Sequence, residues 1–123
     1  MKNQRIADLF SAMADLLEIL GESPFRVNSY RKAARVLEEL AEDIEAVAAA
    51  DRLTEIEGIG DSTAEKIRQY LAEGRIEQYD KLKAQVPPDL PGLLDVPGLG
   101  PKTVAKLWKQ ASITSVAELR EAL

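Results

Sequence analysis

The sequence contains no cysteine and no histidine. Disulfides and thiolate chemistry are therefore excluded, as are most zinc sites and acid–base catalysis by imidazole. Long apolar runs are missing too, because no stretch approaches the roughly eighteen apolar residues of a membrane span. The N-terminus also lacks the apolar core and cleavage site of a secretory leader. From these absences we expect a cytoplasmic protein with no membrane partner.

Positive charge is scarce overall, since 16 basic residues stand against 21 acidic ones and the formal net charge is −5. This balance excludes a uniformly cationic DNA-binding surface. The charges are segregated, however: residues 25–37 and 96–111 contain basic side chains and no acid, whereas acids gather in residues 38–45. Segregation favours local contacts with phosphates, although solvated helix faces would have the same pattern. The basic side chains are Arg26, Arg31, Lys32, Arg35, Lys102, Lys106 and Lys109.

The most distinctive pattern is a five-residue phrase that occurs twice, forty residues apart, at residues 56–60 and 96–100. Each copy has two glycines around one aliphatic residue and is followed by a helical pattern. Glycines permit a tight turn and a close approach to a ligand, and the next helix offers unpaired N–H groups at its positive end. Two such sites indicate two contacts with a nucleic-acid backbone, through Gly58, Gly60, Gly98 and Gly100.

Other readings of the glycines fit less well. A dinucleotide-binding fingerprint needs a preceding strand and a third glycine, and a phosphate-binding P-loop needs a longer spacer before Gly-Lys-Ser/Thr. A simple helix-turn-helix would use one glycine turn and a base-reading helix. The repeat therefore favours the helix-hairpin-helix motif, with two coincidental tight turns as the remaining alternative.

Hydrophobic periodicity predicts an all-α fold, a small helical domain with two helix-hairpin-helix motifs and no strand. Capping signals place the start of the second helix at Asn28 or Ser29 and the start of the last at Ser115, where Glu118 completes a capping box. Prolines 87, 88 and 91 mark a linker-like stretch. The predicted helices are residues 6–20, 30–49 with a break near Glu42, 53–56, 62–72, 76–82, a short helix ending at Asp95, 101–110, and from Ser115 onward.

Several segments together resemble the amino-terminal region of family X DNA polymerases. They are the run from Asn28 to Ala34, the first glycine phrase, residues 64–67 and residues 71–74; the second phrase, with Lys102, lies where that family has its second helix-hairpin-helix. The resemblance implies a lyase-like DNA-binding domain at residues 1–85 and the start of a fingers-like region at residues 86–123. We expect the polypeptide to continue past Leu123 into the remaining polymerase domains.

The resemblance also implies a function in bacterial base excision repair. The first part would bind the 5′ side of a gapped or nicked DNA and the second part the primer side, in a protein associated with the nucleoid. No cofactor is expected beyond Na⁺ or K⁺ at the hairpins, held by the backbone carbonyls of Thr54, Ile56 and Ile59 and of Leu94, Val96 and Leu99. The DNA-contacting residues would be Arg26, Tyr30, Arg31, Lys32, Arg35, Gly58, Gly60, Lys66, Gly98, Gly100, Lys102 and Lys106.

A deoxyribose-phosphate lyase activity is the first alternative to binding alone. Lys66 matches the family's Schiff-base lysine, and Tyr30 and Arg26 match pocket positions for the sugar phosphate. Lys106, however, has the same place in the second repeat, where no catalysis is expected. Other basic pocket positions are replaced by Phe25, Thr54, Ser62 and Gln78. A protein-interaction module is the second alternative, and nucleotidyl transfer by this segment is not expected.

The two copies differ in the residue that follows the hairpin. Asp61 follows the first, where an anion would disfavour a phosphate or act as a helix cap. Pro101 and Lys102 follow the second. We therefore expect the second hairpin to make the stronger contact with the DNA backbone.

Overall fold

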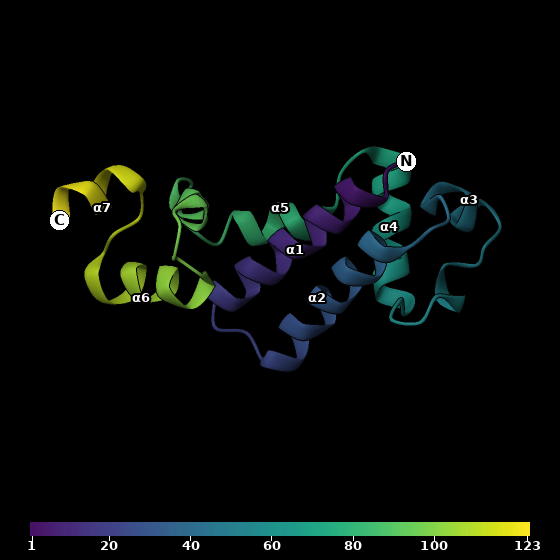
Figure 1. Cartoon of the computed structure of the whole chain (residues 1–123), viewed down its shortest axis with the longest axis horizontal. Helices are drawn as coiled ribbons and strands as arrows, with labels where there is room; N and C mark the ends of the chain where they lie inside the picture. Colours follow the sequence, from purple (N-terminus) through teal and green to yellow (C-terminus); the bar gives the residue numbers. More distant parts are fainter.

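The computed structural model describes residues 1–123 as helices joined by short connections, with no strand, which confirms the predicted all-α fold (Figure 1). Two of the segments are short 3-10 helices, η1 and η2, and each precedes one of the glycine phrases. The elements are α1 (Asn3–Ile19), α2 (Pro24–Glu39), α3 (Ile44–Ala49), η1 (Leu53–Glu55), α4 (Asp61–Glu73), α5 (Glu77–Lys83), η2 (Leu90–Asp95), α6 (Pro101–Ala111) and α7 (Val116–Ala122).

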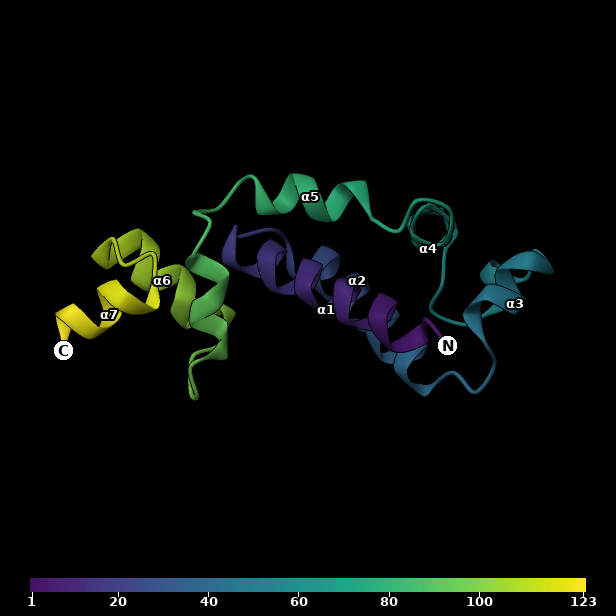
Figure 2. The same cartoon turned by 90° about the horizontal axis from the view of Figure 1, so that it is seen from above.

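Helix α1 is the central element, because it packs against α2, α5 and α6. Its apolar residues occupy more than one face, so it can be buried on several sides. Figure 2 shows α3 and α4 toward one end of the molecule and α6 and α7 toward the other. One hydrophobic cluster runs through both parts and includes Leu90, Leu93 and Val104. The buried residues of α1 are Asn3, Ile6, Ala7, Phe10, Met13, Ala14, Leu16, Leu17 and Ile19.

The predicted start of the second helix is wrong. Helix α2 begins at Pro24, and Ser23 caps it by accepting a hydrogen bond from the N–H of Arg26 at 3.3 Å. Proline suits the first helical position, since its missing N–H has no partner there in any case. Phe25 and Arg26 consequently lie on the first turn of α2. The predicted break near Glu42 is confirmed, because α2 ends at Glu39 and α3 begins at Ile44.

The proline-rich stretch is packed onto the core. Val86, Leu90 and Leu93 are buried, and Pro91 lies inside η2. Apolar residues around the prolines therefore hold this segment in the core, where η2 contacts α6 and α7. The hydrophobic core continues from residues 1–85 into residues 86–123.

The predicted cap at Ser115 is confirmed, but the reciprocal bond of the capping box is displaced by one residue, to Thr114. The Ser115 hydroxyl oxygen accepts a hydrogen bond from the N–H of Glu118 at 3.1 Å, and the Glu118 carboxylate accepts one from the N–H of Thr114 at 3.1 Å. The hydrogen bonds from Thr114 lower the pKa of Glu118 below its ordinary value. No helix of the structure is both long and apolar enough to cross a membrane.

Candidate nucleic-acid interface

The two glycine phrases adopt the same backbone turn. Gly58 has φ of +96° and Gly98 has φ of +88°, a region that L side chains rarely occupy. Gly60 and Gly100 are extended, with φ/ψ of −91°/−176° and −95°/176°. The turn therefore requires glycine at its first position in both copies, and two equivalent hairpins are present as predicted.

Equivalent hydrogen bonds close the two turns. The N–H of Ile59 donates to the carbonyl of Ile56 at 3.0 Å, and the N–H of Leu99 donates to the carbonyl of Val96 at 3.1 Å. No side chain caps the helix that follows either hairpin. The first N–H groups of α4 and α6, except at Pro101, are therefore available to an anion.

The hairpins differ in what surrounds them. A Cβ on Gly58 would lie 2.9 Å from Cγ2 of Val36 and 3.3 Å from Cε of Lys32, so the first hairpin lies directly on α2. Nothing lies within 4 Å of the same position on Gly98. The first glycine of the first hairpin is therefore packed against another helix, and that of the second hairpin is open.

Two predicted DNA contacts on α2, Lys32 and Arg35, are exposed, and neither forms an ion pair. Lys32 is the residue whose side chain touches the Gly58 position. Arg26 pairs with Glu22 at 3.2 Å, with both side chains 43% exposed. An exposed pair of this kind contributes little stability, so a phosphate could replace the Glu22 carboxylate.

Arg31 has a structural role that the sequence analysis missed. Its Nη2 lies 2.7 Å from Oε1 of Glu18 and 3.1 Å from Oδ1 of Asp15, so it joins α2 to α1. Burial disfavours its charge, but hydrogen bonds with Glu18 and Asp15 raise the pKa of Arg31 overall. Burial raises the pKa of Asp15, although Arg31 acts against that shift. Two acids three residues apart on α1 were the sequence feature that could have indicated this ion pair.

The second hairpin has Lys102 and Lys106 one turn apart on α6. Both are exposed and form no ion pair. Lys102 also lines a cleft of about 310 Å³ with Glu18 of α1 and Glu22 of the α1–α2 connection. Acidic side chains therefore lie near this lysine, which its neighbours in sequence did not indicate.

Lys66 lies beside Tyr30, as its predicted role requires. Its Nζ is 5.7 Å from the centroid of the Tyr30 ring and donates a hydrogen bond to the Ser62 hydroxyl at 2.8 Å. The Tyr30 ring packs in turn on Phe10, with ring centroids 5.8 Å apart. The half-buried lysine is therefore held by groups from two helices.

The cleft beside Lys66 is polar and carries balanced charge. It has a volume of about 470 Å³ and includes Gln78. Two of its cations already face acids: Lys81 pairs with Glu77 at 3.5 Å and Arg68 with Asp51 at 3.2 Å. Elsewhere, no group of acidic side chains is arranged to hold a metal ion. The charged residues lining the cleft are Lys66, Arg68 and Lys81 against Glu65, Glu73 and Glu77.

Comparison with known proteins agrees with the hairpin geometry. Residues 1–76 match the family model described as a helix-hairpin-helix domain, and residues 91–122 match that of a SAM-like helix-hairpin-helix tandem. The chain therefore belongs to the helix-hairpin-helix domain family.

One curated relative makes the similarity more specific. Over 122 residues the chain is 35% identical to the DNA polymerase/3′-5′ exonuclease PolX of Bacillus subtilis (strain 168). The match covers 99% of this chain and 21% of the relative, in its N-terminal part, so the chain spans about a fifth of that protein's length. The predicted resemblance to the amino-terminal region of family X polymerases is confirmed.

Proposed function

We propose that this chain binds gapped or nicked DNA through backbone phosphates, as the amino-terminal part of a family X DNA polymerase. The observation that carries the proposal is the pair of equivalent hairpins, each leading into a helix that no side chain caps. Similarity to a DNA polymerase supports nucleic acid as the ligand. In this proposal the protein is associated with the nucleoid, and the other polymerase domains belong to the same polypeptide.

Each hairpin has its own cations. Lys32 touches the first hairpin and Arg35 lies on the same helix, whereas Lys102 and Lys106 follow the second hairpin. Phosphate contacts of this kind fix the position of the DNA and read no bases, so we expect little sequence preference. The local arrangement suits a chain whose net charge is −5.

In this proposal the two hairpins bind the DNA on different sides of a gap. Helices α4 and α6 lie toward opposite ends of the molecule (Figure 2), and α1, of 17 residues, is about 25 Å long. One DNA strand end at each hairpin would suit this separation. We assign the 5′ side to the first hairpin and the primer side to the second.

Phe25 adds a contact for an unpaired base. Its side chain is 89% exposed on the first turn of α2, the helix that carries Lys32 and Arg35. An exposed aromatic ring on a helix that contacts DNA offers a platform on which any unpaired base can stack. Phe25 would thus favour gapped over nicked DNA.

Fluorescence anisotropy on gapped, nicked and intact duplexes across a salt series tests this function. We expect binding that weakens linearly with the logarithm of salt concentration, tightest for the gapped duplex. Absence of binding to all three at low salt would support the protein-interaction module instead.

A monovalent cation at each hairpin is part of the proposal. The ligands would be the carbonyls of Thr54, Ile56 and Ile59, and of Leu94, Val96 and Leu99. At the first hairpin the carbonyl of Ile56 already accepts one hydrogen bond, whereas those of Thr54 and Ile59 accept none from the backbone, so three oxygens have capacity for an ion.

Replacing K⁺ or Na⁺ with tetramethylammonium at constant ionic strength tests these ion sites. We expect weaker DNA binding and altered amide resonances of Gly58 and Gly98. Unchanged affinity and spectra would contradict the sites.

Lyase activity is a second candidate, favoured by the position of Lys66 against Tyr30 and Ser62. The neutral amine would attack the sugar aldehyde and release water to form an iminium. The adjacent carbon would then lose a proton, and its C–H electron pair would shift toward the iminium nitrogen to give an enamine. Return of that pair would form a carbon–carbon double bond and expel the 3′ phosphate, which leaves with the electrons of its C–O bond. The balanced charge of the cleft weighs against tight capture of a 5′-phosphate.

Borohydride trapping on 5′-deoxyribose-phosphate DNA tests the lyase. A covalent adduct that is lost in Lys66→Ala but kept in Lys106→Ala would support it. The Lys106 variant is matched because both lysines have the same place in their repeats. No adduct with the unmodified protein would leave DNA binding as its function.

A further inference from the structure

We infer that Asn3, Glu42 and Arg52 are positioning residues that hold the first hairpin in place against α2. The inference rests on the proposed function, because it assigns these residues to DNA binding without any contact with DNA. It concerns a chain of polar contacts that runs from α1 to the segment before the first hairpin.

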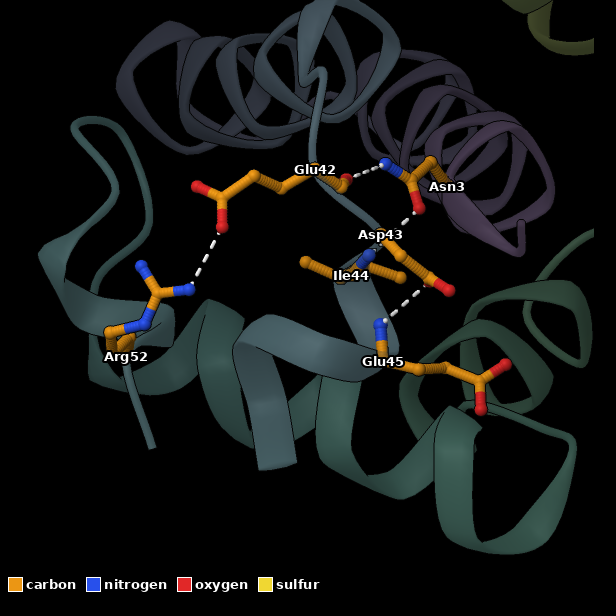
Figure 3. Close-up of polar contacts among 6 residues, drawn as sticks. All are labelled: Asn3, Glu42, Asp43, Ile44, Glu45 and Arg52. Atoms are coloured by element: carbon orange, nitrogen blue, oxygen red, sulfur yellow. Dashed lines mark hydrogen bonds and ion pairs between the residues drawn. The ribbon is translucent and has the colours of Figure 1, made fainter. Parts of the chain in front are cut away.

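The chain begins at Asn3, a buried side chain that is 6% exposed. Its Nδ2 donates to the carbonyl of Glu42 at 2.7 Å, and its Oδ1 accepts from the N–H of Ile44 at 2.9 Å (Figure 3). One amide therefore satisfies two backbone groups of the α2–α3 connection. Because an unpaired buried backbone group is costly, this connection is fixed to α1.

Glu42 passes the restraint on to η1. Its Oε2 lies 2.8 Å from Nη2 of Arg52 (Figure 3), and this hydrogen bond raises the pKa of Arg52. Arg52 directly precedes η1, and its carbonyl accepts a hydrogen bond from the N–H of Glu55 at 3.1 Å. The beginning of the helix that leads into the hairpin is thus joined to the connection that Asn3 holds.

A second contact restrains the residues just before η1, and it comes from α4, the helix after the hairpin. Asp51 lies in the left-handed region, with φ of +56°, and its Oδ1 accepts a hydrogen bond from Nη2 of Arg68 on α4 at 3.2 Å. Residues 51 and 52 are therefore bound both to the α2–α3 connection and to the helix after the hairpin. Gly58, between these restraints, fits closely against α2.

The second hairpin has no equivalent restraint. Forty residues after Asp51, Arg52 and Arg68 the chain has Pro91, Gly92 and Trp108, none of which is charged. The second hairpin therefore serves as an internal control for any experiment on the first.

The exposed ion pair between Glu42 and Arg52 is the best place for a test, because removing the buried Asn3 side chain would also lower the stability of the fold. We expect Glu42→Ala and Arg52→Ala each to weaken binding to a gapped duplex by about two- to fivefold. If net charge alone mattered, Glu42→Ala would tighten binding. The double variant should be no weaker than either single variant, and exchanging the two charges (Glu42→Arg with Arg52→Glu) should restore affinity.

Asp80→Ala and Arg75→Ala are the matched controls. They break another exposed ion pair, at 3.1 Å, with the same charge changes and away from both hairpins; Arg75 also lies 3.8 Å from Glu73. We expect neither to weaken binding through loss of the pair. Equal effects from the two pairs, or tighter binding by Glu42→Ala, would overturn the inference.

Amide NMR spectra without DNA give an independent readout. In Glu42→Ala and Arg52→Ala we expect the resonances of Gly58 and Gly60 to shift or broaden, while those of Gly98 and Gly100 stay unchanged. Unchanged Gly58 and Gly60 would overturn the positioning role. Failure of the unmodified protein to bind DNA would contradict the proposed function, and the spectra would still decide the positioning role.

Discussion

The two hairpins of this chain have one backbone conformation and two different environments. Ile59, between the first pair of glycines, is 3% exposed, whereas Leu99 in the second pair is only partly buried. Gly58 touches α2, and the Gly98 position is open. Local sequence is therefore sufficient for the turn, but contacts distant in sequence decide how firmly each turn is held.

The difference bears on how each hairpin would bind DNA. A hairpin that is already fixed in its binding conformation loses little freedom when it binds, so it gains affinity from preorganisation. The second hairpin lacks that support, but Lys102 follows it where Asp61 follows the first. Preorganisation at the first hairpin and charge at the second are thus the two effects to separate.

The largest expected difference is in stability. Gly58→Ala should cost about 2–5 kcal/mol, because it combines positive φ with a steric clash against Val36. Gly98→Ala should cost about 1–2 kcal/mol, from φ alone. Urea unfolding of both variants measures the difference, and equal losses would contradict the contrast in packing.

Removal of the exposed Phe25 ring should affect only the DNA binding that involves the surface of α2. Phe25→Ala should weaken binding to a gapped duplex by about 1–3 kcal/mol and leave binding to an intact duplex unchanged. Anisotropy on the two substrates measures this. An equal loss on both would mean that Phe25 supports the fold or contacts the backbone.

The lysines test the expected rank of the hairpins. Lys102→Ala should reduce the salt slope by about 1 and should weaken affinity more than Lys32→Ala does. The anisotropy salt series measures both variants. If Lys102→Ala changed neither affinity nor slope while Gly58→Ala abolished binding in a folded protein, the rank would be reversed.

The smallest effect concerns acid pH at the end of the second motif. Hydrogen bonds from Thr114 lower the pKa of Glu118, so its stabilisation of α7 is present above the ordinary value of 4.5 and is lost as pH falls through the lower folded value. Amide resonances of Thr114 and Glu118 should shift in that range. Glu118→Gln should remove this titration, and a titration that persists would contradict the assignment.

Local patterns predicted much of this structure. Gly58 and Gly98 indicated the turns, and Ser115 with Glu118 indicated the start of α7. The start of α2 was missed because Asn28 and Ser29 are also good caps, whereas packing of Val27 into the core favours the earlier cap at Ser23. The prolines suggested a linker because the burial of Val86, Leu90 and Leu93 around them depends on contacts with distant residues.

The candidate site was predictable only in part. Lys66 and Tyr30 lie next to each other, and the family resemblance had already assigned both residues to one pocket. Arg31 was predicted only as a DNA contact, and its ion pairs with Asp15 and Glu18 were missed because a basic side chain does not reveal which acids it will face. The Asn3 contacts join residues about forty positions apart, so no local pattern could indicate them.

An amide NMR titration of the isotope-labelled chain with a one-nucleotide-gapped duplex tests the central claim most directly. The account predicts that the resonances of Gly58, Gly60, Gly98 and Gly100 all shift at the same DNA concentration, whereas that of Gly74, at the far end of α4, does not. Binding that leaves either hairpin unperturbed would contradict a two-hairpin grip on the DNA backbone.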